Sequence, residues 1–178
     1  MDVFALSSGD WFVIRAHARQ ERILAEELLG DGLAIYQPRL CERRDYAGFR
    51  ANVEVSMFPG YLFLRGTAAE AALVRENPRV ASVAPVAPAS GEDSRFTAEL
   101  CAIELARSLG AGLRHSPIPE GSVPVKVNAG RFRGVVGVID PEPIDVAESQ
   151  CGKLYLPIHA IAQAVSMDVE PGALVPAR

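Results

Sequence analysis

The side chains that suit acid–base or metal chemistry are few and scattered along this chain. Its histidines and cysteines follow none of the spacings of a metal site or a disulfide framework; they are His17, His115, His159, Cys41, Cys101 and Cys151. Adjacent acids occur at Glu26-Glu27 and Glu92-Asp93, where a solvated surface is a better interpretation than an acid–base pair. No glycine-rich phosphate loop of the Walker type is present. The sequence therefore predicts a protein that is not an enzyme and that has no metal or other cofactor.

Recognition chemistry is indicated more strongly by the segment 57–65, Met-Phe-Pro-Gly-Tyr-Leu-Phe-Leu-Arg. Pro59 has no N–H for a sheet ladder and Gly60 tolerates unusual backbone angles, so we expect a bend followed by a strand. Side chains alternate on a strand, which separates two rows: Tyr61 with Phe63, and Leu62 with Leu64. Either both rows are buried in a sheet that is covered on both faces, or the aromatic row is a surface for a partner.

A second candidate for recognition is a polar cluster at the expected start of the first helix. Arg19 and Arg22 could hold phosphate, and Gln20 could read the edge of a base. A solvated helix start explains the same residues equally well. Because the net charge is −4, any contact with nucleic acid must come from such a local cluster.

Length and composition limit the class of protein. The 178 residues, of which 49 % are hydrophobic, have room for one large domain or two small ones. No apolar run approaches the roughly 20 residues of a membrane span, and Met1–Leu6 lacks the basic region of a secretion signal. We therefore expect a cytoplasmic protein with reduced thiols.

The elements that must position these residues follow from hydrophobic periodicity. It predicts a first domain of the α+β class, in the order β-α-β-β-β-α-β-α. The expected strands are 11–15, 34–40, 53–57, 61–65 and 80–86. The expected helices are 19–29, with Leu24, Ala25, Leu28 and Leu29 buried; a short one after the capping box Thr67–Glu70, carrying Leu73 and Val74; and 97–109, capped by Thr97, with Leu100 and Ile103 buried.

The rest of the chain has a different pattern. We place the first domain at residues 9–112 and a semi-stiff linker with Pro117 and Pro119 at 113–122. Residues 123–178 form a second domain of short strands, expected at 123–127, 134–139, 152–157 and 161–167. Short strands that are separated by turn residues are typical of a small barrel.

Together these motifs resemble the NusG family of transcription factors. Trp11–Ile14 with Gln20-Glu21 is similar to the opening of that family's N-terminal domain, Phe58–Tyr61 to its central motif, and residues 73–80 to its second-helix motif, with Arg79 where glycine is usual. Residues 125–139 resemble the KOW motif of SH3-like barrels, with Gly130, Phe132, Gly134 and Gly137 as its markers.

The resemblance implies a factor that travels on elongating RNA polymerase and modulates pausing, termination or antitermination. By motif, Arg15, Phe58, Tyr61 and Phe63 would form the pocket for the clamp helices of the polymerase β′ subunit. His17, Arg19, Gln20 and Arg22 are the candidates for contact with non-template DNA. The second domain would recruit another partner, such as a ribosomal protein or a termination factor. The gate-loop positions Glu70, Ala71 and Ala72 and the short linker favour a specialised paralogue.

Two alternatives remain open at the level of sequence. One is an RNA- or ribosome-binding KOW protein, which the acidic net charge disfavours. The other concerns the second domain, which in RfaH-type members can form a helical hairpin. Here Pro124 and the glycines of the KOW segment disfavour long helices, so we expect a stable barrel in which Phe132 fills the interior.

Overall fold

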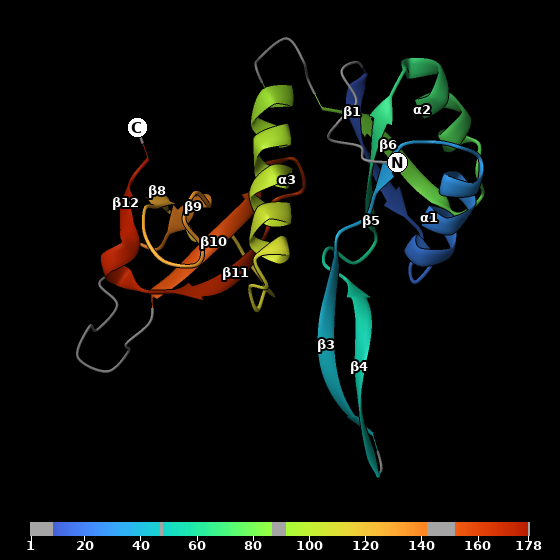
Figure 1. Ribbon diagram of the computed structural model, residues 1–178. Helices are drawn as coiled ribbons and strands as arrows, with labels where there is room; N and C mark the ends of the chain where they lie inside the picture. The colour runs from blue at the N-terminus through green and yellow to red at the C-terminus, as the bar shows by residue number, and fades with distance from the viewer. Residues whose placement is uncertain (1–8, 47, 87–91, 142–151, 178) are drawn as a thin grey trace. The chain divides into compact units, whose positions relative to one another are not determined.

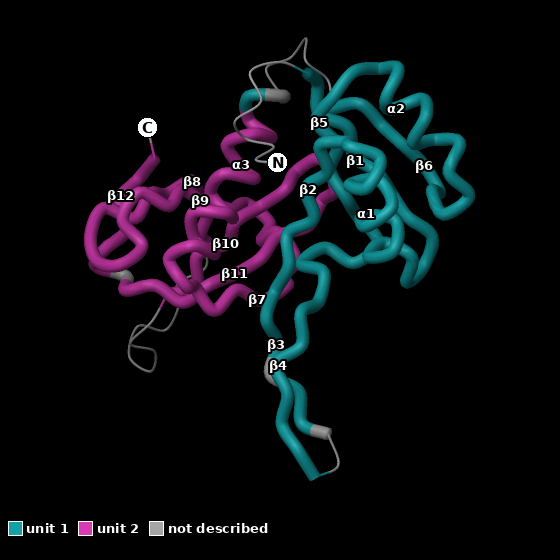
Figure 2. The backbone as a smooth tube through the Cα atoms, turned by 45° about the vertical axis from the view of Figure 1, so that its right-hand side comes forward, with its two compact units in different colours: residues 1–94 teal, residues 95–178 magenta. Residues whose placement is uncertain are grey.

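The computed structural model describes residues 9–46, 48–86, 92–141 and 152–177. The chain divides into two compact units, residues 1–94 and 95–178 (Figure 2). Antiparallel sheets and helices make up both units, so the α+β class expected from the sequence is confirmed. Each unit is described by itself below.

The first unit is built on an antiparallel sheet with the strand order β2-β5-β1-β6 (Figure 1). Its strands are β1 (Asp10–Ala16), β2 (Ile35–Tyr36), β5 (Tyr61–Gly66) and β6 (Val80–Pro85). β1 lies in the interior of the sheet and pairs with both β5 and β6. The strand expected at 34–40 is in fact two, since β2 ends before Pro38 and the chain then enters a hairpin.

Two helices cover one face of this sheet, α1 (Glu21–Gly30) and α2 (Ala68–Arg75) (Figure 1). The core between them and the sheet contains Phe12, Ile14, Leu62, Leu64, Leu24, Ala25, Leu28, Ala71 and Val74. The prediction that Leu29 is buried is wrong, because its side chain is 48 % exposed; Leu73 on α2 is 65 % exposed. Each follows or precedes a buried residue in the sequence and lies at the edge of the buried stripe. A surface helix buries only one side, so residues at this edge remain exposed.

The hairpin of β3 (Arg39–Tyr46) and β4 (Phe49–Ser56) leaves the sheet of the first unit as a separate two-stranded ribbon (Figure 1). Among the described residues, these two strands pair only with each other. The backbone N–H of Met57 donates to the carbonyl of Pro38 at 2.9 Å and closes the base of the ribbon.

The bend expected at Pro59-Gly60 connects this ribbon to β5. The N–H of Tyr61 donates to the carbonyl of Phe58 at 3.0 Å, and Gly60 has φ +82°, which favours glycine. The carbonyl of Gly60 accepts from Ala16 N at 2.8 Å, so the bend is tied to the end of β1.

The second unit contains most of α3 (Glu92–Ser108) and a six-stranded antiparallel sheet with the order β12-β8-β9-β10-β11-β7. Its strands are β7 (Arg114–Ser116), β8 (Val123–Val127), β9 (Val136–Ile139), β10 (Gly152–Ile158), β11 (Gln163–Val169) and β12 (Leu174–Pro176), with 3-10 turns η2 (His159–Ile161) and η3 (Pro171–Ala173). Within 123–141 and 152–177, the helical elements are these two single turns, so the expected strands form instead of a helical hairpin.

The structure corrects the expected boundary between the domains. The segment 113–122 is not a free linker, because β7 pairs with β11 and the hydroxyl groups of Ser116 and Ser166 are 2.7 Å apart. α3 also falls largely in the second unit, where the carboxylate of Glu99 accepts from the backbone N–H of His159 at 3.1 Å. Since α3 begins at Glu92, Thr97 lies inside the helix and does not cap it.

The capping box at the start of α2 is present as predicted. The N–H of Glu70 donates to Oγ1 of Thr67 at 3.2 Å, and the N–H of Thr67 donates to Oε2 of Glu70 at 2.7 Å. The hydrogen bonds from the backbone N–H and hydroxyl of Thr67 lower the pKa of Glu70 below its ordinary value of 4.5. These bonds satisfy amides that α2 would otherwise leave unpaired.

We predict that Thr67→Ala destabilises the first unit by about 1 kcal/mol, since it removes the side-chain acceptor of the cap. Trp11 is the single tryptophan of the chain and lies in this unit, so its fluorescence during urea unfolding reports the effect. Thr67→Ser, which keeps the hydroxyl, is the matched control and should lose far less. Equal losses in both variants would show that the cap is not responsible.

Candidate functional site

The face of the first sheet that lies opposite the helices carries most of the predicted recognition residues. Alternation along β1 and β5 turns Phe12, Ile14, Leu62 and Leu64 toward the helices and the residues between them the other way. The register then places Arg15 opposite Tyr61 and Val13 opposite Phe63, while β2 brings Tyr36 opposite Phe63. We call this surface the aromatic face; it contains Trp11, Val13, Arg15, Tyr36, Tyr61, Phe63 and Arg65.

Ring contacts organise the centre of the aromatic face. Phe63 lies edge-on to Phe58 with ring centroids 6.2 Å apart, and it stacks with Tyr36 at 6.4 Å. The guanidinium of Arg65 lies over the ring of Trp11, 5.3 Å from its centroid. Edge-on and offset stacking are the favoured geometries of aromatic pairs, and cation–π contact suits arginine over tryptophan.

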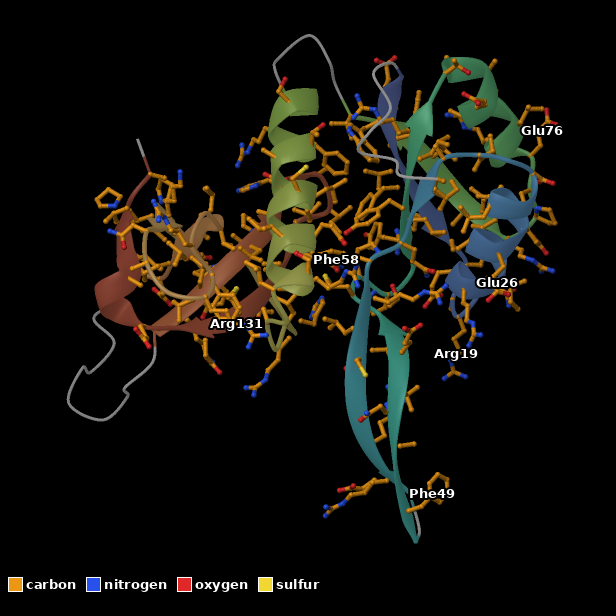
Figure 3. All side chains as sticks on the ribbon, in the orientation of Figure 1. Arg19, Glu26, Phe49, Phe58, Glu76 and Arg131 are labelled. Carbon is orange, nitrogen blue, oxygen red and sulfur yellow. The ribbon has the colours of Figure 1, made fainter. Side chains whose placement is uncertain are left out.

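The predicted pocket residues differ in exposure. Phe58 (labelled in Figure 3) and Phe63 have no exposed surface. Tyr61 is half-buried and Arg15 is exposed. The structure thus brings Arg15, Tyr61 and Phe63 onto one face and sets Phe58 against Phe63, while only Tyr61 and Arg15 of the four present surface.

The predicted nucleic-acid residues lie in the segment that joins β1 to α1. Arg19 is exposed and adopts φ +62°, a left-handed conformation that is rare for a residue with a side chain. Figure 3 shows this side chain extending away from the ribbon. Arg22 is paired with Glu26 at 3.1 Å, and His17 is exposed. Arg19 is therefore the candidate whose guanidinium has no partner among the described residues.

The sequence did not predict the ion-pair network behind this segment. Nε of Arg79 donates to Oε1 and Oε2 of Glu27 at 3.0 and 3.1 Å, and its Nη1 donates to Oε1 of Gln20 at 3.3 Å. Nδ2 of Asn77 donates to Oε2 of Glu27 at 3.4 Å. The hydrogen bonds from Arg79, and then Asn77, lower the pKa of Glu27 below its ordinary value of 4.5. The one signal in the sequence was Arg79 itself, at a position where the family resemblance leads one to expect glycine.

The KOW markers of the second unit lie around one turn. Gly130, Phe132 and Gly134 are in the turn between β8 and β9, and Gly137 is within β9. A Cβ atom at Gly137 would lie 2.5 Å from the carbonyl oxygen of Tyr155, so this position requires glycine. Phe132 is only half-buried, with the guanidinium of Arg131 5.6 Å from its ring centroid, and the expectation that it fills the interior is wrong. Smaller residues occupy that place, among them Val125, Val135, Leu154, Leu156 and Val165.

An apolar groove of about 470 Å³ lies in the second unit, between α3 and strands β9 and β10. Leu105 and Val136 line it and are 38 % and 44 % exposed. Its polar rim includes Arg95, Glu99 and His159, which are joined because Nε of Arg95 donates to Glu99 at 3.0 Å and Glu99 contacts the ring of His159.

We also searched the described residues for metal sites, disulfides and membrane-spanning helices. These residues contain no group of three His, Cys, Asp or Glu side chains that could hold a metal ion. Cys41 and Cys101 are exposed and are not joined in a disulfide, and Cys151 lies outside the described residues. None of the described helices is long and apolar enough to cross a membrane.

We predict that Glu27→Gln lowers the free energy of unfolding of the first unit at pH 7 and that this loss shrinks in acid. The folded pKa of Glu27 is lowered, so the pair stabilises the fold above the ordinary pKa of 4.5 and loses its effect as the pH falls through the folded pKa. Urea unfolding followed by Trp11 fluorescence between about pH 7 and pH 3 measures this dependence.

Arg79→Ala should give the same pH dependence as Glu27→Gln, and the double variant should lose less than the sum of the two. A loss that stays constant down to pH 3 would contradict the ion-pair explanation.

Two solved structures are similar to this chain at low sequence identity. Among solved structures, the chain is similar to Thermotoga maritima NusG, in a structure titled for its domain interaction, with 15 % identity, a TM-score of 0.46 and coverage of 96 % of this chain and 98 % of that chain. It is also similar to a chain of the MjSpt4:Spt5 complex, with 16 % identity, a TM-score of 0.27 and coverage of 94 % and 96 %. No curated protein matches.

The family model described as transcription termination factor nusG matches residues 9–97. The matched residues include β1, α1, the Pro59-Gly60 bend and the loop that carries Arg79. They amount to half of the 178-residue chain. This is a family of transcription factors, not of enzymes, and the chain belongs to it: it is a NusG-family transcription elongation factor.

Proposed function

We propose that this chain binds transcribing RNA polymerase through the aromatic face of its first unit and modulates pausing and termination, as an antitermination factor. The observation that carries the proposal is the register of β1 and β5, which aligns Arg15 with Tyr61 beside Phe63 on the face opposite the helices. The partner would be the clamp helices of the polymerase β′ subunit. The tyrosine ring and the guanidinium that this face exposes are groups suited to anchor a helix tip.

The exposed members of the aromatic face define the contact. Tyr61 offers an apolar ring with a hydroxyl at its edge, and Arg15 adds a cation directly across the strand pair. Tyrosine and arginine are enriched among residues that dominate binding energy. Phe58 and Phe63 support Tyr61 from within the fold, since their rings pack on each other and have no exposed surface.

The segment between β1 and α1 would contact the exposed non-template DNA strand. Arg19 supports this, because its guanidinium is exposed and has no partner among the described residues. Its left-handed backbone is costly for a residue with a side chain, and such outliers concentrate at functional sites. Gln20 and His17 flank it, whereas the charge of Arg22 is already compensated by Glu26.

The second unit, with its KOW segment, would recruit a further partner such as a ribosomal protein or a termination factor. The apolar groove beside α3, with Leu105 and Val136 exposed, supports a protein partner there. Arg79 in place of the usual glycine, together with Glu70, Ala71 and Ala72 at the gate-loop positions, favours a specialised paralogue over the housekeeping factor.

We predict that Tyr61→Ala weakens binding to core RNA polymerase by about 2 kcal/mol, which is roughly 30-fold. Arg15→Ala should weaken it as well, and this exposed position carries little risk to folding. Leu73→Ala, on an exposed position of α2, is the control and should bind like the wild type. Titration of each full-length variant with core polymerase measures the affinities.

If the double variant at Arg15 and Tyr61 is folded and binds polymerase as tightly as the wild type, the proposed interface is wrong. If the full-length chain does not bind core polymerase but does bind ribosomes or structured RNA, the alternative function of an RNA- or ribosome-binding KOW protein is supported.

We also predict that Arg19→Ala reduces the salt dependence of binding to elongation complexes by about one unit of slope, since one phosphate contact is lost. Arg22→Ala should reduce it less, because Glu26 already compensates that charge. The measurement is the affinity for complexes with an exposed non-template strand across a series of salt concentrations. Crosslinks that place this strand elsewhere on the protein would refute the contact.

A further inference from the structure

The ribbon of β3 and β4 has a free strand edge on each side. Among the described residues, each of these strands pairs only with the other. The outer edge of β4 therefore carries backbone donors and acceptors that another strand can use. Figure 3 labels Phe49 near the far end of the ribbon, where its side chain is 63 % exposed.

The hydrogen bond at the base of the ribbon determines which residues of β4 face outward. The N–H of Met57 donates to the carbonyl of Pro38, so these two residues form a bonded pair. Bonded and non-bonded pairs alternate along two antiparallel strands. The register then makes Glu54, Asn52 and Arg50 members of non-bonded pairs. Their backbone N–H and C=O groups point away from β3, along the free edge of β4.

The side chains of β4 are arranged for pairing with a second copy of the chain. When two β4 strands run antiparallel with Asn52 opposite Asn52, Arg50 of each copy lies opposite Glu54 of the other. All of these residues face outward, so the backbone groups meet in the same register as the charges. On the other face, Phe49 lies opposite Val55 of the second copy. Opposite charges and aromatic–β-branched pairs are favourable across strands.

The charges in this arrangement are accessible. Arg50 pairs with Asp45 at 3.0 Å within the chain, and Glu54 pairs with Arg39 at 3.4 Å. The side chains of Arg50 and Glu54 are nevertheless 67 % and 70 % exposed. Exposed ion pairs add little to stability, so an exchange of partners between two copies costs little.

The free edge of β3 does not match a second copy in this way. An antiparallel register centred on Glu42, Arg43 or Arg44 places a charged residue opposite its own copy. Like charges directly opposite each other are destabilising. The charge pattern therefore selects β4 as the edge that pairs.

We propose that two copies of this chain associate through the outer edges of β4, antiparallel and centred on Asn52, so that two ribbons form one four-stranded sheet. The contact extends from Phe49 to Val55 of each copy and is smaller than the roughly 1,200–2,000 Å² of a standard stable interface. The dimer is therefore weak and concentration-dependent. Its contact residues are separate from Arg15 and Tyr61, so this inference goes beyond the proposed function.

Sedimentation of the full-length chain by analytical ultracentrifugation tests the association. The apparent mass should rise from that of one chain toward that of two as the concentration increases from about 10 µM to about 1 mM. A reducing buffer excludes a disulfide through the exposed Cys41. A chain that stays monomeric at the highest concentration overturns the inference, including the case in which β4 pairs with a strand of a different protein.

Proline variants identify the edge. Asn52→Pro should abolish the association, because proline has no N–H for the new strand ladder. The N–H of Asn52 points outward, where an edge strand tolerates proline, so the hairpin itself should still form. Cys41→Pro makes the same change at an outward position of β3 and is the matched control. An association that survives Asn52→Pro, or that Cys41→Pro abolishes, overturns the proposed edge.

Charge-exchange variants test the register and do not depend on the folding of a proline variant. Arg50→Glu and Glu54→Arg each place like charges opposite one another and should weaken the dimer at least about tenfold. An equimolar mixture of the two variants should associate again, because each copy supplies the charge that the other needs. Wild-type association of either variant alone, or a mixture that stays monomeric, overturns the inference.

Discussion

The antiparallel pairing of β1 with β5 is the constraint on which the first unit depends. It aligns six residue pairs, from Asp10 with Gly66 to Arg15 with Tyr61. A slip of one residue would turn Ile14 and Leu62 away from the helices and bring charged and polar groups into the core. The bend at Gly60 protects the register, because its carbonyl is hydrogen-bonded to the last residue of β1. The face that packs on the helices and the aromatic face therefore arise from a single alignment.

The Arg79–Glu27 pair performs a similar role for the polar segment next to this sheet. It joins the second half of α1 to the loop before β6, and the carbonyl of Arg79 accepts from the N–H of His17, so the backbone next to Arg19 is held at a defined place. The pair is partly exposed, and solvent limits what such a pair adds to stability. Its stronger consequence is orientation, since the bond from Arg79 to Gln20 decides which atoms of that amide face outward.

The sheet of the second unit includes β7, a strand from the segment that the sequence predicts to be a linker. β11 has an open edge that β7 completes, and the hydroxyl contact between Ser116 and Ser166 joins the two strands. An unpaired edge leaves a row of backbone donors and acceptors without partners, so pairing with a nearby strand is favourable. α3 brings Glu99 to the backbone of His159 in the same unit.

Much of the first unit could be predicted from the sequence because its signals are local. Runs of bulky apolar residues marked β1 and β5, Pro59-Gly60 marked the bend, and Thr67 with Glu70 marked the start of α2. Each of these features depends on residues that are neighbours in the chain, so backbone geometry and side-chain periodicity are sufficient to find it. The α+β class and the family resemblance follow from the order of such signals.

What only the tertiary structure decided depends on contacts between residues far apart in the chain. Glu27 and Arg79 are 52 residues apart, and no local pattern pairs them. The exposure of Leu29 and Leu73, the burial of Phe58, and the place of β7 likewise depend on what lies across the fold. Periodicity predicts which face of a helix or strand a residue lies on. Whether another element covers that face depends on tertiary packing, which forms only in the folded chain.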